Sequence, residues 1–433
     1  MKKGLIIFSL ATLCVTSQAQ EGWTLRQCID YAIEHNIEIQ QTANEAEQNA
    51  IEVNTAKWAR LPNLSGSSGQ NWSWGRSQSP KDNTYSDVNS GSTQFGLNTN
   101  VPLFTGLQLP NQYALSKLNL KAAIEDLNKA KEDIAINVTS SYLQVLFNME
   151  LSKVAASQTE LSKEQCKRII RLAEVGKASS AEVAEAKARV AQDEMSLVQA
   201  ENNYQLALLD LSQLLELPTP EGFTLAQPDT VVNFAPLTAP DDIYTEALSN
   251  KPGIRAAQFR LEGSEKSIRI AQSNYYPQLS LGTNFYTLNG SAEHSFGSQL
   301  KNNLNKGIGF NLSVPLFNRL ATRNRVRSAR LQQTNLALQL NNTKKVLYKE
   351  IQQAWYNAVA AESKFNSSMA AVTANEESFR LMSEKFDNGK ATFVEYNEAK
   401  QNLTKSLSDK IQAKYDYLFR TKILDFYKGK AIE

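Results

Sequence analysis

The sequence predicts an α+β membrane protein built from two similar halves, each with short strands followed by very long helices. Val-Pro-Leu-Phe occurs at 101–104 and again at 314–317, and Gly-Lys-Ala occurs at 176–178 and again at 389–391. Both motifs therefore recur at an interval of 213 residues (315 − 102 and 389 − 176). A stretch that alternates between apolar and small polar residues precedes each Val-Pro-Leu-Phe motif. A long internal repeat of this kind constrains the fold more strongly than any local pattern does.

The N-terminus has the three parts of a secretory signal peptide, which we expect to cover residues 1–19. Lys2 and Lys3 are followed by an apolar stretch and then by the small-x-small sequence Ser17-Gln18-Ala19. The alternative is a lipoprotein anchored at Cys14. It is less favoured because the residue before a lipidated cysteine is usually small, whereas here it is Leu13.

Composition and motifs give no indication of an enzyme, a cofactor or a nucleic-acid partner. The net charge is +2, and the basic residues are scattered along the predicted helices. Cys28 and Cys166 lack the spacing of metal ligands, and His35 and His294 are the only histidines. After the signal, no run of about 18 apolar residues follows. This leaves an exported periplasmic protein, or one that crosses a membrane as β-strands.

The first repeat spans residues 20–216. Thr24 is the expected N-cap of its first helix, and Pro62 ends that helix near Arg60. Alternation at Phe95, Leu97 and Val101 predicts a strand, and the helix that follows would be roughly 100 Å long. In order, we predict a helix at 24–60, barrel strands at about 63–74 and 92–104, a long helix at about 107–174 and a return helix at about 179–216.

The second repeat spans residues 241–425 and follows a connector at 217–240 that holds five prolines. We expect Pro252 to divide its first helix. Two strands are predicted at about 278–288 and 304–317, a long helix at about 320–386 and a return helix at about 393–425. A short tail, 426–433, completes the chain.

The four strands are long enough to cross a bilayer when tilted, and the residues that alternate with the apolar ones are small and uncharged. A soluble sheet with one buried face is the less favoured alternative. A barrel in lipid must close, and four strands cannot close alone. Two chains would supply eight strands and three would supply twelve, and the small inward residues favour the trimer with a water-filled lumen.

Heptad spacing in the long helices predicts coiled-coil packing. In the first return helix the apolar residues Val183, Val190, Leu197, Tyr204 and Leu211 are seven apart. A companion row of Ala186, Ala200, Ala207 and Leu214 is interrupted by Asp193. We expect the helices of three chains to form a hollow periplasmic tunnel that continues the barrel.

The two Gly-Lys-Ala turns and their flanks, Arg171–Val183 and Phe386–Glu395, resemble the helical-hairpin tips of TolC-like outer membrane factors. The resemblance extends over nearly the whole mature chain. It implies a homotrimer in the cell outer membrane, in contact with its lipid, that docks onto a periplasmic membrane-fusion adaptor. The adaptor would link it to an inner-membrane pump, usually of the resistance-nodulation-division type and less often an ATP-driven exporter.

The resemblance also implies roles for particular residues at the tips. Glu395 and Glu398 match the acidic residues that close the tunnel, Glu182 matches an acidic position after the first turn, and Lys390 lies beside Ala391, where some members carry a basic residue. A solvated helix face is the alternative for these glutamates. The turn residues expected to dock the adaptor are Gly176, Lys177, Ala178, Ser179, Gly389, Ala391 and Thr392. The prolines expected at the barrel strand ends are Pro62, Pro102, Pro277 and Pro315.

Five arginines, at positions 319, 323, 325, 327 and 330, crowd the start of the second long helix. A solvated helix face and a contact with anionic groups near the inner leaflet of the outer membrane both account for them.

The favoured function is the outer membrane channel of a tripartite multidrug efflux system, which conducts substrates passively and has no catalytic activity. The alternatives are the channel of a type I protein secretion system, a periplasm-spanning tether that does not conduct, and a soluble coiled-coil scaffold.

Overall fold

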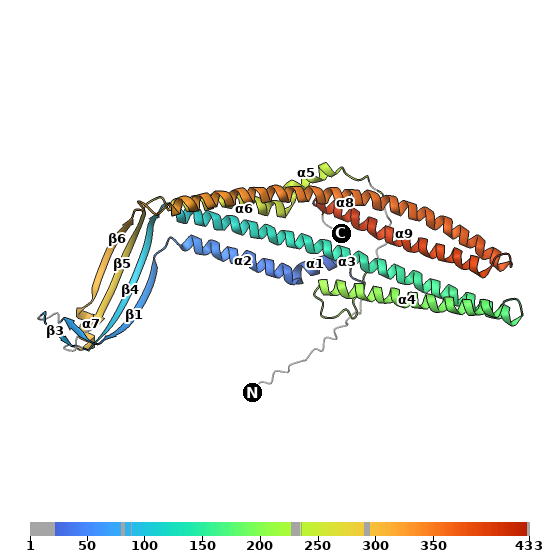
Figure 1. Cartoon of the computed structure of the whole chain (residues 1–433), viewed down its shortest axis with the longest axis horizontal. Coiled ribbons are helices and arrows are strands. Elements are labelled where there is room, and N and C mark those ends of the chain that lie inside the picture. Colours follow the sequence, from blue (N-terminus) through green and yellow to red (C-terminus); the bar gives the residue numbers. More distant parts are fainter. Residues whose placement is uncertain are drawn as a thin grey trace, which may run out of the picture. The chain divides into compact units, whose positions relative to one another are not determined.

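The computed structural model describes residues 22–78, 83–87, 89–226, 234, 236–289 and 295–430. The predicted signal peptide, Cys14 and His294 lie outside these residues. The chain forms two compact units: unit 1 comprises Met1–Gln40, Ala130–Asn250 and Leu347–Glu433, and unit 2 comprises Gln41–Lys129 and Lys251–Val346. Figure 1 shows the elements along the chain. The long helices α3 (Gln108–Glu174) and α8 (Ala321–Asp387) each contribute to both units.

Unit 2 contains a four-stranded antiparallel sheet in the order β1-β4-β5-β6, so β1 and β6 are its edges. The strands are β1 (Asn63–Ser73), β4 (Ser90–Thr105), β5 (Gln278–Asn289) and β6 (Asn305–Ser313). Figure 1 shows the strands side by side in this order. Because the outer two strands have no further partner within the sheet, both present unpaired backbone hydrogen-bonding groups.

The register of the sheet separates its residues into an apolar face and a polar face. On one face Leu97 lies opposite Phe285, and Leu281 lies opposite Phe310. On the other face Asn98 lies between Ser65 and Asn284. Because side chains alternate along a strand, every second residue joins the same face. The polar face also carries Tyr286 and Leu288 toward one end of β5, and its small or amide residues are Asn63, Ser65, Ser67, Asn98, Asn100, Ser280, Gly282, Asn284, Gly307, Gly309 and Asn311.

The ends of the strand region differ from the prediction in two ways. The structure ends β6 at Ser313 rather than near 317, and Pro315, which has no backbone N–H, cannot extend the ladder. The segments between the two predicted strands of each repeat contain elements that were not predicted: a small hairpin of β2 (Arg76–Gln78) and β3 (Tyr85–Asp87), and the short helix α7 (Phe296–Asn302). Elements this short carry too few residues for a periodic pattern to reveal them.

The helices of unit 2 are α2 (Ile37–Trp58), most of which lies in this unit, α6 (Pro252–Ser273) and the first parts of α3 and α8. Two ion pairs join α3 to α6: Arg255 with Glu125 and Arg260 with Asp126. A methyl group at Gly263 would lie 3.1 Å from Leu115, so this glycine permits the close approach of the two helices.

Unit 1 contains two long antiparallel helical hairpins, α3 with α4 (Ser180–Leu214) and α8 with α9 (Phe393–Tyr427). Helices α3 and α8 have 67 residues each and begin 213 positions apart (321 − 108). Helices α4 and α9 have 35 residues each and are also 213 apart (393 − 180). The interval found in the motifs therefore also separates the helices.

Two shorter helices complete unit 1, α1 (Leu25–His35) and α5 (Pro240–Asn250). The continuous helix predicted at 24–60 is wrong, because the chain leaves helical geometry at Asn36. The Asn36 side chain accepts hydrogen bonds from the N–H groups of Glu38 (3.0 Å) and Ile39 (3.3 Å), and so caps α2. The second repeat breaks at the matching place, where Pro252 opens α6 as predicted.

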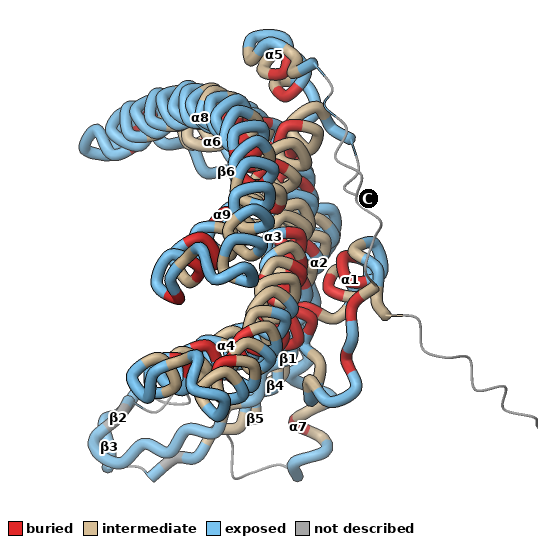
Figure 2. Tube along the Cα trace, turned by 90° about the vertical axis from the view of Figure 1, so that its right-hand side faces the viewer, coloured by how far each residue is buried: buried red, intermediate tan, exposed pale blue. Residues whose placement is uncertain are grey.

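The connector is tied to the start of the described chain. Trp23 forms a parallel bridge with Leu225, and the hydroxyl of Tyr142 in α3 donates to the carbonyls of Trp23 (3.2 Å) and Ala226 (2.9 Å). Figure 2 shows that buried residues recur in patches along the helices, whose remaining surface is exposed. No helix among the described residues is long and apolar enough to cross a membrane.

Candidate functional site

The two helical turns of unit 1 have the same backbone geometry. At the first turn the N–H of Gly176 bonds to the carbonyl of Ala173 (3.0 Å), and that of Lys177 bonds to Leu172 (2.8 Å). At the second turn Gly389 and Lys390 repeat the pattern, with distances of 3.0 and 2.8 Å. This is the Schellman motif, and it requires a positive φ, which Gly176 (73°) and Gly389 (69°) supply.

Each turn is followed by a complete capping box. The backbone N–H of Ser179 donates to a carboxylate oxygen of Glu182 (2.7 Å), and the N–H of Glu182 donates to the Ser179 hydroxyl (3.2 Å). Thr392 and Glu395 form the same reciprocal pair at 2.8 and 3.2 Å. The backbone hydrogen bond and then the hydroxyl hydrogen bond lower the pKa of Glu182 and of Glu395. Both carboxylates therefore cap their own helix.

The other two predicted constriction residues are placed differently. Glu398, one turn further along α9, and Lys390, in the turn itself, are exposed. Neither has a salt bridge among the described residues. The four predicted residues therefore fall into two capping carboxylates and two side chains that are available to a partner or to a solute.

Behind the turns, an apolar cluster joins the two hairpins. Cys166, Ile169 and Ala186 of the first hairpin pack with Phe393 and Tyr396 of the second. Beside this cluster Arg168 of α3 forms an ion pair with Asp387 at the end of α8. The Arg168 guanidinium also lies 5.9 Å from the centre of the Phe386 ring.

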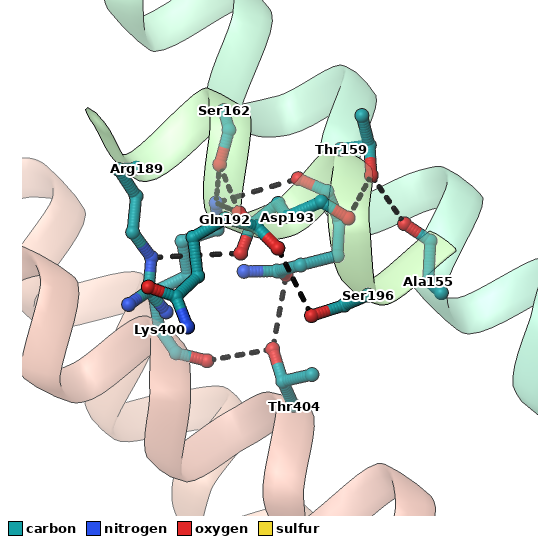
Figure 3. A network of polar contacts seen from close by, with 10 residues as sticks. Ala155, Thr159, Ser162, Arg189, Gln192, Asp193, Ser196, Lys400 and Thr404 are labelled. Atoms are coloured by element: carbon teal, nitrogen blue, oxygen red, sulfur yellow. Dashed lines mark hydrogen bonds and ion pairs between the residues drawn. The ribbon is translucent and has the colours of Figure 1, made fainter. Parts of the chain in front are cut away.

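Further from the turns, a buried polar network joins three helices (Figure 3). The ammonium of Lys400 in α9 lies 3.3 Å from a carboxylate oxygen of Asp193 in α4, and donates to the hydroxyl of Ser162 in α3. Lys400 and Asp193 are only 3% and 6% exposed. Burial lowers the pKa of Lys400, while the charge of Asp193 opposes that shift. A charge this deeply buried requires such a partner.

Further groups surround the Asp193 carboxylate. The Thr159 hydroxyl donates to the backbone carbonyl of Asp193 (3.1 Å), and Arg189 lies 3.5 Å from the other carboxylate oxygen. Asp193 interrupts the companion heptad row of α4, and no functional role was predicted for it from that position. That interruption was the available signal, because a charged residue in a buried heptad position needs a counter-charge. Lys400 could have been found in the same way, four residues after the buried Tyr396.

The prolines predicted at the strand ends, together with Cys28 and His35, occupy positions that stabilise the fold. Pro62 and Pro277 each directly precede a strand, β1 and β5, and Pro102 lies in β4 beside a shift in register. Cys28 is fully buried, and burial raises the pKa of its thiol to about 12, so it stays protonated. His35 stacks on Tyr31, with ring centres 4.0 Å apart.

Comparisons of the sequence and of the fold with known proteins all find outer membrane proteins. The family model described as Outer membrane efflux protein matches residues 28–216 and 243–428. The chain is 22% identical over 435 residues to outer membrane protein TolC of Escherichia coli (strain K12), in an alignment that covers 96% of this chain and 84% of TolC. Its fold is similar to that of the CmeC outer membrane channel of Campylobacter jejuni, with a TM-score of 0.80, 20% identity and coverage of 93% of this chain and 84% of CmeC. For the outer membrane protein VceC of Vibrio cholerae the TM-score is 0.79, the identity 18% and the coverage 94% and 97%.

Proposed function

The chain belongs to the outer membrane efflux protein family and is a protein of the cell outer membrane, and from this premise we propose that it is the outer membrane channel of a tripartite export system. In this role it conducts substrates passively to the outside from a periplasmic adaptor and an inner-membrane pump of the resistance-nodulation-division type. One observation carries the proposal: a sheet with one apolar face, one uncharged polar face and two free edges.

The two free edges call for further copies of the chain. An open sheet edge cannot be satisfied in hydrocarbon, so the wall must close through other chains. Successive strands in the order β1-β4-β5-β6 alternate in direction, so a β1 strand from a second copy would continue the alternation beside β6. Three copies would make a barrel of twelve strands, with the apolar face toward lipid.

The polar face suits a water-filled lumen. Apart from Tyr286 and Leu288 toward one end of β5, its residues are mostly serine, glycine and asparagine, which leave space, and none of its residues is charged. A twelve-stranded barrel is wider than the eight-stranded barrels that side chains fill. A duct of this kind needs no catalytic residue, because the inner-membrane pump supplies the energy.

We assign the turns of the hairpins to adaptor docking and the exposed acidic residue beyond the second turn to the pore constriction. The first turn presents Gly176, Lys177 and Ala178, and the second presents Gly389 and Ala391. Glu398 is exposed and would face the pore together with Lys390. Glu182 and Glu395 would contribute charge there while they also cap α4 and α9.

The test is conductance of the purified full chain in planar lipid bilayers. A channel gives discrete conductance steps, whereas a trimer that gives none would be a tether. Glu398→Gln should reduce the preference for cations several-fold. Glu185→Gln is the matched control, because Glu185 is exposed at the same place in the first hairpin (398 − 213). An unchanged cation preference in Glu398→Gln would remove Glu398 from the constriction.

A further inference from the structure

Charge is segregated between the two helices at the margins of unit 2. Residues 319–330, which lead into α8 and form its first turns, hold five arginines and no acidic residue. All five are exposed, and no salt bridge involves them among the described residues. Helix α2 carries Glu45, Glu47 and Glu52 in its unit 2 part, against a single Lys57. Figure 1 shows α2 leading into the edge strand β1 and α8 starting near the end of the edge strand β6.

The corresponding segments inside the unit are not polarised in this way. The counterpart of 319–330 is 106–117, which contains one lysine and no arginine. This junction has neighbours within the chain: a methyl group at Gly106 would lie 2.5 Å from the carbonyl oxygen of Ser273. The counterpart of α2 is α6, whose charges are mixed and include Arg260 paired with Asp126. The segregation is therefore found on the exposed sides of the two marginal helices, whose other sides are buried within the chain at Ala46 and Ala56 of α2 and at Thr322 and Val326 of α8.

Each marginal helix also exposes apolar side chains beside its charges. On α8, Arg327, Leu331 and Leu338 follow helical spacing, and the two leucines are 68% and 61% exposed. On α2, Ile51 and Trp58 are seven residues apart and 58% and 51% exposed. Glu45 and Glu52 are also seven apart. An apolar stripe flanked by one sign of charge is the pattern of a helix that packs against another helix.

We propose that the start of α8 in one copy packs antiparallel against α2 of the next copy, so that Arg327 and Arg330 face Glu52 and Glu45. This inference rests on the proposed closure of the barrel by several copies. If β6 pairs with β1 of the next copy, α8 leaves the sheet beside the α2 that enters it. The strand directions thus select this helix pair.

The heights of the charged groups along the two helices agree. Arg327 is six residues from the first residue of α8, and Glu52 is six residues from the last residue of α2. At a rise of 1.5 Å per residue both lie roughly 9 Å from the helix ends that face the sheet. Arg330 lies roughly 14 Å from the start of α8. This height is between that of Glu52, roughly 9 Å from the end of α2, and that of Glu45, roughly 20 Å from the same end. Complementary charge at such a seam selects the partner and its register.

Disulfide cross-linking of the full chain in outer membranes tests the contact. The double variant Glu52→Cys/Arg327→Cys should form dimer and trimer bands on a non-reducing gel after mild oxidation. Either single variant should form none, because the two faces of the contact are different. The control pair Glu47→Cys/Arg325→Cys lies on the other flanks of the two helices and should give no bands. The native thiols Cys28 and Cys166 are buried.

Charge exchange separates a second copy from a lipid phosphate as the partner of the arginines. Arg327→Glu should reduce the heat-modifiable trimer several-fold, and Arg327→Glu/Glu52→Arg should restore it. A lipid contact predicts no rescue by Glu52→Arg, and that result would overturn the proposal. Normal trimers without the expected cross-link would also overturn it and leave the channel function intact. A wild-type chain that stays monomeric in light scattering would instead remove the proposed function itself.

Discussion

At the residue scale, the pair of Lys400 and Asp193 places two opposite charges in the buried interior of unit 1. Each charge is removed from water and satisfied by the other together with Ser162. The desolvation of such a pair offsets much of its attraction, so its main effect is to specify alignment rather than to add stability. Because Ser162, Asp193 and Lys400 come from α3, α4 and α9, one network sets the register of three helices.

We predict that Lys400→Met destabilises the protein by about 3 kcal/mol, the lower end for a broken buried pair, because the Asp193 carboxylate then keeps only the partly exposed Arg189, 3.5 Å away, as a counter-charge among the described residues. Adding Asp193→Leu should recover most of the loss. Lys187→Met is the matched control, since Lys187 is exposed at the equivalent place in α4 (400 − 213). Thermal unfolding of the detergent-purified protein is the measurement. Equal effects of Lys400→Met and Lys187→Met would contradict the assignment.

At the element scale, the hairpins depend on how each return helix begins. Glycine turns and capping boxes satisfy the backbone groups that the helix ends leave unpaired. In each turn the glycine reverses the chain and the following Ser or Thr starts the return helix. The sequence signature of both boxes, Ser-x-x-Glu and Thr-x-x-Glu, is local, so the start of α4 and α9 could be predicted.

These boxes also predict a pH dependence. The pKa of Glu182 and of Glu395 is lower in the folded protein than the ordinary value of 4.5. Their stabilisation is therefore complete above that value and is lost as pH falls through the lowered folded value. Hydrogen exchange should show weaker protection of the first turns of α4 and α9 at pH of about 3 than at pH of about 6, after correction for intrinsic rates.

The variant Glu182→Gln serves as the control for this dependence. It keeps a side chain that can cap the helix but cannot ionise, so protection in α4 should become independent of pH while that in α9 stays dependent. Ser179→Ala should weaken the start of α4 by about 1 kcal/mol. A pH dependence that persists in Glu182→Gln would show that another group causes it.

Elements also show where local patterns were insufficient. The break at Asn36 has no proline or glycine, and only the capping hydrogen bonds of its side chain reveal it. Helix α7 depends on tertiary contacts. The hydroxyl of Thr287 in β5 donates to the carbonyl of Leu300 (2.9 Å), and the ring centres of Phe296 and Phe95 are 6.5 Å apart. A seven-residue helix is unstable without such contacts.

At the scale of the whole molecule, we expect the two faces of the sheet to differ in their tolerance of a charged side chain. Phe310 and Asn311 are neighbours in β6 on the apolar and polar faces. Phe310→Arg should cost about 2–4 kcal/mol if the apolar face meets lipid. The level of heat-modifiable oligomer in outer membranes should fall sharply in this variant and change little in Asn311→Arg. Similar losses in both variants, or in neither, would contradict the membrane orientation of the sheet.

The sequence alone determined the family, the outer membrane location, and the combination of short strands with very long helices. It could do so because strand alternation, heptad spacing and the Gly-Lys-Ala turns are properties of neighbouring residues, and because the 213-residue interval repeats the motifs. Only the tertiary structure decided that Asp193 meets Lys400, 207 positions away, and that β4 lies beside β5. Such contacts depend on which faces of distant segments meet in space, and a local pattern carries no information about that partner.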